Sequence, residues 1–437
     1  MIVSHLIKSE YAFFLSGTTS RFSFSGRLSA LRHKDYFRYW SGSFASVGAT
    51  MLQTMAQGWL LFELTDSVIM LGYLGAAASI PTILMTLFGG ALADRINKRH
   101  VLMTTSISIF FLLALLALLD ATAYITPWGV IAIAAVVSVI TGFDWPTRAA
   151  IFPHLINKED MMSAVALNSI IWQSSRMVMP MIGGFVIALV GTWLVFALCA
   201  LGFLSMFFVM AGLKIESPKV IETREKQSTL EQVKEGLSFI IHNKVFLILI
   251  SLSYAAMFFG MSHMQLMPAF SSLLEAGEQG YGLLLSATGV GAVVGTILIG
   301  SYQDSKRLGH IMLGSATMAG LSIFVFAFIA AFGDSFKHAF FLAIISILIA
   351  ATFNSMFMIS SMTVLQLRVP DHLRGRVMGF HGVTYSMIPL GGLSAGFIAS
   401  ISSPPTAIAI STSLFLLFIL YITISRAEIR KLSMKNY

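Results

Sequence analysis

Long apolar runs constrain the fold of this 437-residue chain more than any other feature of its sequence. Twelve such runs, bounded by charge or by proline and glycine, approach or exceed the roughly 20 residues that a helix needs to cross a bilayer. They lie at about 36–63, 67–93, 100–120, 127–148, 163–189 and 192–212, and at about 244–271, 281–303, 310–333, 338–367, 376–400 and 404–425. The pattern predicts an all-α membrane protein with twelve transmembrane helices.

The composition excludes most other classes of protein. Only 11% of the residues are charged, whereas a soluble domain carries about a quarter, and the mean hydropathy is +0.82. A soluble enzyme and a disordered chain are therefore excluded. The net charge of +8 is spread over many short loops, which excludes a nucleic-acid-binding domain. The one cysteine, Cys199, lies inside an apolar run, so no intrachain disulfide is possible.

Lysine and arginine gather in alternate loops. The opposite loops carry acidic residues, with Lys337 as their one basic residue. The positive-inside rule then predicts a multi-pass protein of the bacterial inner membrane with both termini in the cytoplasm. We expect a cytoplasmic segment at 1–35, six-helix bundles at 36–212 and 244–425, a cytoplasmic linker with a short surface helix at 213–243, and a cytoplasmic tail at 426–437.

The two halves of the chain repeat weakly. The segment 90–99, with a glycine and an aspartate before a basic cluster, has a counterpart at 300–307, about 210 residues later. The segment 180–184, a proline followed by paired glycines, has a counterpart at 389–392. Two parallel six-helix repeats around a central cavity suit a transporter that works by alternating access.

The repeated segments resemble known motifs of the major facilitator superfamily. The segment 90–99 resembles the loop between the second and third helices of that superfamily, although Asn97 stands where a glycine is usual. The segment 180–184 is similar to the end of the motif of its antiporters, with Ser175 and Met179 in place of two glycines.

Two further segments resemble the enterobactin-exporter-like branch of that superfamily. They are 144–150, which reads Asp-Trp-Pro-Thr-Arg-Ala-Ala, and 31–38 before the first run. The resemblance covers about residues 31–425 and implies a proton-driven exporter.

Three ionisable residues are the first candidates for proton coupling. Asp144 and Arg176 lie inside apolar runs, where such residues usually face a partner or a wet cavity. Arg148 follows Asp144 by four residues and shares its helix face. We predict that Asp144 pairs with Arg176 or with Arg148, and that protonation of Asp144 breaks the pair during transport. The alternative is a static ion pair that fastens the fourth span to the fifth.

Histidines are the candidates for proton binding in the second half, which has no acidic residue deep in an apolar run. His263 or His381 would bind the proton there, because histidine titrates near physiological pH. The alternative for each is a hydrogen-bonded packing residue.

Charged residues of the two repeated loops are expected to act as conformational latches on the cytoplasmic side. A carboxylate there can meet the positive end of a helix dipole, and an arginine can complete a bond that breaks on opening. The alternative is that these are ordinary loop charges. The latch residues are Asp94, Arg95, Arg99, Asp304 and Arg307.

The resemblance implies that the first, fourth, seventh and tenth spans line the cavity. The polar residues that we expect to contact substrate there are Gln53, Gln57, Tyr254, His263, Gln265, Asn354 and Gln366. Proline and glycine should let two further spans bend and pack closely. These residues are Pro180, Gly183, Gly184, Gly391 and Gly392.

Together these features predict a secondary active transporter, not an enzyme. No phosphate-binding loop, nucleophile triad or metal cluster appears in the sequence, so we expect no cofactor and no metal ion. The expected partners are a small-molecule substrate, protons and membrane lipids. We expect the protein to be a monomer and to bind no nucleic acid. We expect export of a siderophore or an amphipathic drug-like compound by proton antiport. The alternatives are a lipid or lysophospholipid translocator, a non-transporting membrane sensor and an importer, because the sequence does not fix the direction of transport.

Overall fold

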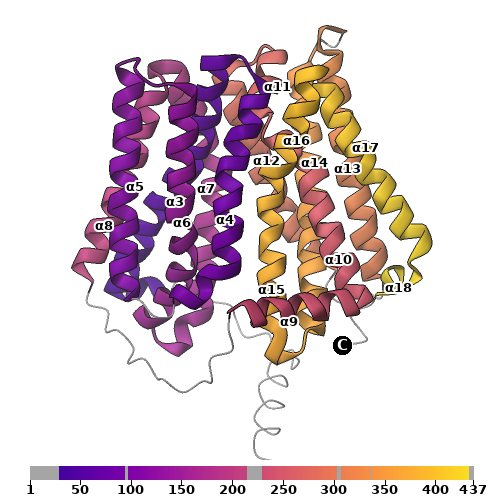
Figure 1. Ribbon diagram of the computed structural model, residues 1–437, viewed down its shortest axis with the longest axis horizontal. Helices are drawn as coiled ribbons and strands as arrows, with labels where there is room; N and C mark the ends of the chain where they lie inside the picture. Colours follow the sequence, from indigo (N-terminus) through magenta and orange to yellow (C-terminus); the bar gives the residue numbers. More distant parts are fainter. Residues whose placement is uncertain (1–28, 94–96, 214–228, 303–306, 336, 433–437) are drawn as a thin grey trace, which may run out of the picture.

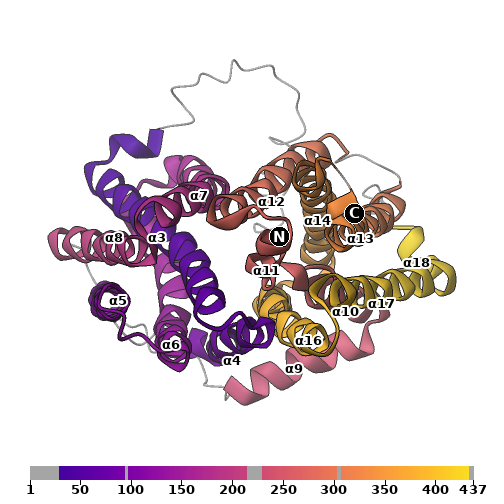
Figure 2. The same cartoon turned by 90° about the horizontal axis from the view of Figure 1, so that it is seen from above.

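The computed structural model describes residues 29–93, 97–213, 229–302, 307–335 and 337–432. Throughout these residues the chain forms helices joined by short connections, and it builds two helical bundles that stand side by side (Figures 1 and 2). Ten helical segments among them are long and apolar enough to cross a membrane. The predicted all-α membrane architecture is therefore confirmed.

The first bundle consists of six helices. They are α3 (Lys34–Thr65), α4 (Val68–Ala93), α5 (Lys98–Ala121), α6 (Pro127–Ile151), α7 (Met161–Val190) and α8 (Thr192–Gly212). Helix α3 packs against α7 and α8, and α6 packs against α4 and α5. The first two predicted runs correspond to α3 and to α4, which holds the shorter apolar stretch Val68–Leu84.

Helix α5 begins at a capping residue that the sequence motif did not anticipate. The Asn97 side chain accepts hydrogen bonds from the backbone N–H groups of Arg99, at 3.1 Å, and His100, at 3.4 Å. Asparagine is among the best residues at this position, because it satisfies amides that the helix leaves unpaired. The cap gives a physical reason for asparagine in place of the usual glycine.

The second bundle has more elements than the six continuous helices that we expected. They are α10 (Lys244–Ala255), α11 (Met267–Leu273), α12 (Gly277–Gly300), α13 (Leu308–Ala331), α14 (Ala339–Arg368), α15 (Arg374–Gly382), α16 (Met387–Ile401), α17 (Pro404–Ser425) and α18 (Ala427–Arg430). The run at 244–271 is interrupted by a π-helical turn at Ala256–Gly260 and a 3₁₀ turn at Ser262–Met264. Because the interrupting residues are largely apolar, hydropathy alone predicts an unbroken helix.

The linker contributes a helix to the surface of the second bundle. Helix α9 (Thr229–His242) lies across one end of the second bundle, where it packs against α15 and lies below α10 in Figure 1. Glu235 of α9 forms an ion pair with Arg376 of α15, and Ile240 is buried. We call this end of the molecule the linker end and the opposite end the far end; the predicted orientation makes the far end periplasmic.

The two bundles meet along a seam formed by α7 with α12 and by α4 with α16. Glycines bring the backbones close together. Gly184 of α7 lies opposite Gly282 of α12, and Gly289 of α12 lies against the backbone of Met177. Small residues permit such contacts between helices in a membrane. The largest apolar cluster among the described residues continues across this seam, from Leu52 and Met55 to Leu284 and Phe326.

Candidate proton-coupling site and polar stripe

Helix α6 carries a part-buried ion pair near its linker end. Nε of Arg148 lies 2.5 Å from Oδ2 of Asp144, and the two side chains are 9% and 13% exposed. The hydroxyl of Thr105 on α5 donates to Oδ1 of Asp144 at 3.2 Å. Both carboxylate oxygens therefore have a donor. This is what a carboxylate needs to stay charged away from water.

Helix α3 completes the surroundings of Arg148. Nη1 of Arg148 donates to the hydroxyl of Ser43 at 3.4 Å, and the hydroxyl of Tyr39 donates to the Arg148 carbonyl oxygen at 3.4 Å. The pair thus connects α3, α5 and α6 through hydrogen bonds. A change in the charge of Asp144 would act on three helices of the first bundle.

A small cavity of about 140 Å³ lies beside the pair. Its lining residues come from α3, α6 and α7: Ser46, Val47, Thr50, Thr141, Asp144, Arg148 and Trp172. The space suffices for a few water molecules, at roughly 30 Å³ each, and hydroxyl groups supply their partners. The arrangement can bring a proton to a carboxylate that is otherwise shielded from solvent.

Arg176 does not take part in this pair. We predicted Arg176 or Arg148 as the partner of Asp144, and the structure contains the second pairing. Arg176 is exposed and forms no ion pair among the described residues, and its backbone carbonyl lies against Gly289 of α12. The ion pair stays within α6, so it does not fasten the fourth span to the fifth. Arg148 has the advantage of lying one turn away on the same helix.

The two histidines of the second bundle are both buried. His263 lies at the break between α10 and α11, where Nδ1 is 3.2 Å from the carbonyl oxygen of Gly260 and the ring faces Phe326. His381 lies in α15, and its Nδ1 has no hydrogen-bond partner among the described residues. The hydrogen bond of His263 matches the packing alternative, whereas no such bond holds Nδ1 of His381 among the described residues.

Two glutamines on α3 form a buried amide pair. Nε2 of Gln53 donates to Oε1 of Gln57 at 3.3 Å, and both side chains are almost fully buried. Nε2 of Gln57 has no partner among the described residues. An unpaired buried amide is costly, so such a group is a candidate for binding a ligand.

The amide pair belongs to a polar stripe on α3. The stripe consists of Ser43, Ser46, Thr50, Gln53 and Gln57. Spacings of three and four residues place these side chains on one face of the helix. At one end the stripe meets Arg148. Beyond its other end, on a different face of α3, the ring of Trp59 stacks 5.8 Å from that of Tyr281 across the seam. Sequence reasoning named only the glutamines and missed the three hydroxyl residues, although their spacing was readable.

The remaining predicted cavity residues are not gathered at one place. The hydroxyl of Tyr254 donates to the Phe380 carbonyl oxygen at 2.7 Å, and Nε2 of Gln265 donates to the Leu71 carbonyl oxygen at 2.8 Å. Asn354 is partly buried, and Gln366 is exposed near the linker end of α14. Tyr254 and Gln265 are thus engaged with backbone groups of neighbouring helices.

The predicted latch lies partly outside the described residues, since Asp94, Arg95 and Asp304 belong to segments that the structure does not describe. Arg99 donates through Nε to the Met210 carbonyl oxygen at 2.9 Å and through Nη2 to that of Ala211 at 2.7 Å. A cation at the end of α8 complements the helix dipole. Arg99 therefore connects two helices of one bundle, and Arg307 is exposed before α13.

The predicted bending residues all lie at close contacts. Gly183 lies against Leu52 and Met55, and Gly184 faces the backbone of α12. Pro180 lies inside α7, which continues to Val190. In the second bundle Gly391 lies against the carbonyl group of Phe258, and Gly392 lies against Gln265.

The sequence has relatives among transporters of bacteria. It is 24% identical over 365 residues to the staphyloferrin A transporter of Staphylococcus aureus, covering 83% of this chain and 89% of that protein. It is 24% identical to the multidrug efflux pump Tap of Mycolicibacterium fortuitum, over 84% of this chain and 90% of the pump. It is also 24% identical to the enterobactin exporter of Escherichia coli, over 75% of this chain and 83% of the exporter.

Solved structures share the fold. A nucleoside transporter aligns with a TM-score of 0.69 at 14% identity, over 92% of this chain and 99% of that one. A bacterial homologue of the iron transporter ferroportin aligns with a TM-score of 0.67 at 15% identity, over 88% and 98%. The sequence profile of the transmembrane secretion effectors matches residues 25–436. The chain therefore belongs to the transmembrane secretion effector family of the major facilitator superfamily of transporters.

Proposed function

We propose that this protein is a secondary active exporter in the bacterial inner membrane. It would move a siderophore or an amphipathic drug-like compound out of the cytoplasm by alternating access, in exchange for protons. Membership of a transporter family supports the transport of a small molecule. Relatives that are named as a staphyloferrin A transporter, an enterobactin exporter and a multidrug efflux pump support the direction and the substrate class.

The observation that carries the proposal is the ion pair of Asp144 and Arg148 beside its small cavity. A proton that reaches Asp144 removes the charge that Arg148 faces. A buried guanidinium without its counter-ion costs several kcal/mol, so Arg148 then favours a position nearer to water or to an anionic group of the substrate. Because hydrogen bonds connect the pair to α3 and α5, this movement would rearrange the first bundle.

The polar stripe on α3 connects proton binding with substrate binding in this proposal. The buried amides of Gln53 and Gln57 would donate to oxygen atoms of the substrate, with the unpaired Nε2 of Gln57 as the first donor. Ser46 and Thr50 lie between these amides and Asp144. Substrate and proton would therefore act on the same helix at points a few turns apart.

The deciding experiment uses the purified protein in vesicles with an imposed pH gradient. The test compounds are staphyloferrin A, enterobactin and an amphipathic dye. We expect the compound that is transported to accumulate against its gradient, and we expect Asp144→Asn to reduce this proton-driven accumulation at least tenfold. Exchange without a pH gradient should persist, because the asparagine resembles the protonated carboxyl group and leaves the amides of Gln53 and Gln57 in place.

The matched control is Asp120→Asn. Asp120, like Asp144, is a part-buried carboxylate, but it lies on α5 at the far end, where it accepts a hydrogen bond from the Thr192 hydroxyl. This control should leave coupling intact. Proton-driven accumulation in Asp144→Asn at the rate of the parent would overturn the coupling role. If none of the compounds is transported but one of them changes the conformation of the protein, the alternative of a non-transporting membrane sensor would be favoured.

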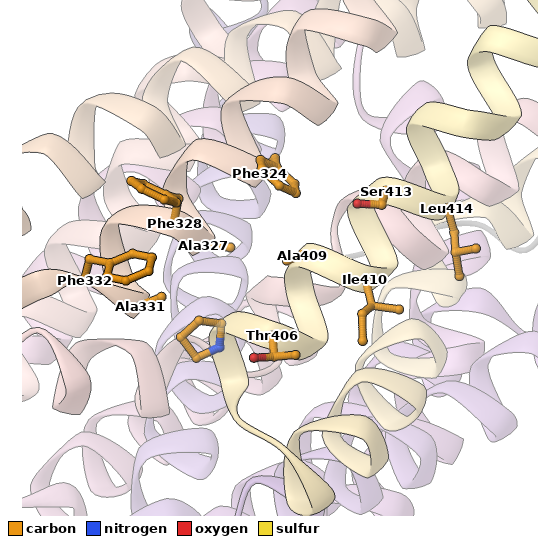
Figure 3. Close-up of a pocket in the computed structure, with 11 residues that line it drawn as sticks. Phe324, Ala327, Phe328, Ala331, Phe332, Thr406, Ala409, Ile410, Ser413 and Leu414 are labelled. Carbon is orange, nitrogen blue, oxygen red and sulfur yellow. The ribbon is translucent and has the colours of Figure 1, made fainter.

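A lipid translocator is the second candidate, and one feature bears on it. An apolar groove of about 520 Å³ lies between α13 and α17, with Phe324 and Phe328 on one wall and Ile410 and Leu414 on the other (Figure 3). Both walls belong to the second bundle, so the groove does not open into the seam between the bundles. Arg176, which would suit a lipid headgroup, lies on α7 of the first bundle. The exporter is therefore favoured, and a fluorescent phospholipid that is moved by the vesicles at the rate of the best test compound would reverse this preference.

A further inference from the structure

The far end of the seam holds a side chain that crosses from one bundle to the other. Gln265 follows the 3₁₀ turn at Ser262–Met264, within the break between α10 and α11. Its Nε2 donates to the carbonyl oxygen of Leu71, on α4 of the first bundle, at 2.8 Å. A carbonyl oxygen has two lone pairs, so Leu71 can accept this bond and keep its helical one.

The Gln265 side chain also lies in a slot that two glycines create. A Cβ on Gly392 of α16 would lie 2.6 Å from Cγ of Gln265, and a Cβ on Gly75 of α4 would lie 3.0 Å from its Cδ. Neither glycine has a positive φ, so the requirement for glycine here is space, not backbone conformation. One wall of the slot comes from each bundle, so the slot requires that the two bundles meet at this end.

The break before Gln265 gives the side chain its position. A continuous helix would direct residue 265 along the regular face of that helix, whereas the π-helical and 3₁₀ turns redirect the chain toward α16. Gly391 lies against the Phe258 carbonyl group, so α16 packs directly on the π-helical turn. The interruption, the slot and the hydrogen bond to Leu71 thus form one arrangement.

We propose that Gln265 is a positioning residue that holds the far end of the transporter closed. Opening this end requires the amide to leave both the Leu71 carbonyl oxygen and the glycine slot. The residue therefore sets the balance between the two access states and does not need to contact substrate. This inference rests on the proposed alternating-access function, but the arrangement itself can be tested without substrate or protons.

The test measures a distance across the far end in the full-length protein, reconstituted in lipid. Spin labels at Tyr124→Cys and Ser402→Cys report on the two bundles, in a background where buried Cys199 is replaced by alanine. Gln265→Leu keeps most of the side-chain volume and removes the donor. Loss of a hydrogen bond of ordinary strength should raise the population with the longer distance about three- to tenfold.

Gly75→Ala tests the slot separately, because it leaves the amide of Gln265 in place. It should shift the population in the same direction, and further than Gly72→Ala does. Both variants crowd α16, since the added Cβ would lie 3.0 Å from Pro389 or from Leu393, but only the Cβ at Gly75 also meets Gln265. The controls are Gln173→Leu, a partly buried glutamine of α7 with no hydrogen bond among the described residues, and Gly314→Ala, where a Cβ meets nothing within 4 Å. Both controls should reproduce the parent distances.

The inference is overturned if the distance populations of Gln265→Leu and Gly75→Ala equal those of the parent. If Gln265→Leu does not fold, Gly75→Ala decides by comparison with Gly72→Ala, and equal shifts in these two variants would overturn the inference. A shift in both variants, in a protein that moves none of the test compounds, would leave this role of Gln265 standing while the proposed exporter function fails.

Discussion

At the scale of single residues, the chemistry of the protein centres on Asp144 and Arg148. Sequence spacing indicated that the two share a helix face, and the structure joins them at 2.5 Å. Spacing did not indicate Thr105 or Ser43, because these come from other helices and meet the pair only through tertiary packing. It also left Arg176 as an equal candidate, since hydropathy gives the depth of a residue but not the direction in which its side chain points.

The pair should behave as a unit when it is mutated. Arg148→Met leaves a part-buried carboxylate without its counter-ion, so we expect a loss of about 3 kcal/mol in the free energy of unfolding. The double variant Asp144→Leu, Arg148→Met removes both charges and should recover most of that stability, while proton coupling stays lost. Apparent unfolding temperatures of the purified proteins measure the first effect, and vesicle transport measures the second. Additive losses in the double variant would contradict an interaction between the two side chains.

At the scale of helices, glycines on the seam determine how closely α7 and α12 approach. A Cβ on Gly289 would lie 2.7 Å from Cα of Met177 and 2.8 Å from the Arg176 carbonyl oxygen. Backbone atoms cannot move aside as the end of a long side chain can, so the helices themselves must separate.

We therefore expect Gly289→Ala to destabilise the protein by about 1–3 kcal/mol, the usual effect of overpacking. Gly300→Ala, on the same helix, is the control, because a Cβ there meets nothing within 4 Å. Apparent unfolding temperatures should fall for the first variant and stay level or rise slightly for the second. Equal values for the two variants would mean that the seam is looser than described.

The helices themselves were largely predictable from sequence, and their interruptions were not. Each of the twelve apolar runs corresponds to a helix or to a broken helix in the structure. The run at 244–271 breaks where Gly260 meets Phe415 and where α16 approaches Phe258. These contacts come from residues more than a hundred positions away along the chain, so no local pattern announces the break.

At the scale of the whole molecule, the charge distribution predicts the orientation in the membrane. Tyr124 lies in the α5–α6 connection at the far end and is 78% exposed, whereas Lys431 lies beyond α17 at the linker end. In intact cells, a thiol reagent that cannot cross the membrane should label Tyr124→Cys. It should label Lys431→Cys only after the cells are opened. Each variant is made in the background without Cys199 and serves as the control for the other. The reverse labelling pattern would mean that the orientation, and with it the proposed direction of transport, is opposite to the predicted one.

The apolar cluster that continues across the seam has a consequence for the transporter when no substrate is bound. Opening the far end would wet side chains such as Leu52, Met55 and Leu284, and hydration of this hydrocarbon is unfavourable. Without substrate, the protein should therefore favour the conformation in which the far end is closed. A cell that makes many copies of such a transporter would keep its ion gradients, because each copy passes few ions until a substrate binds.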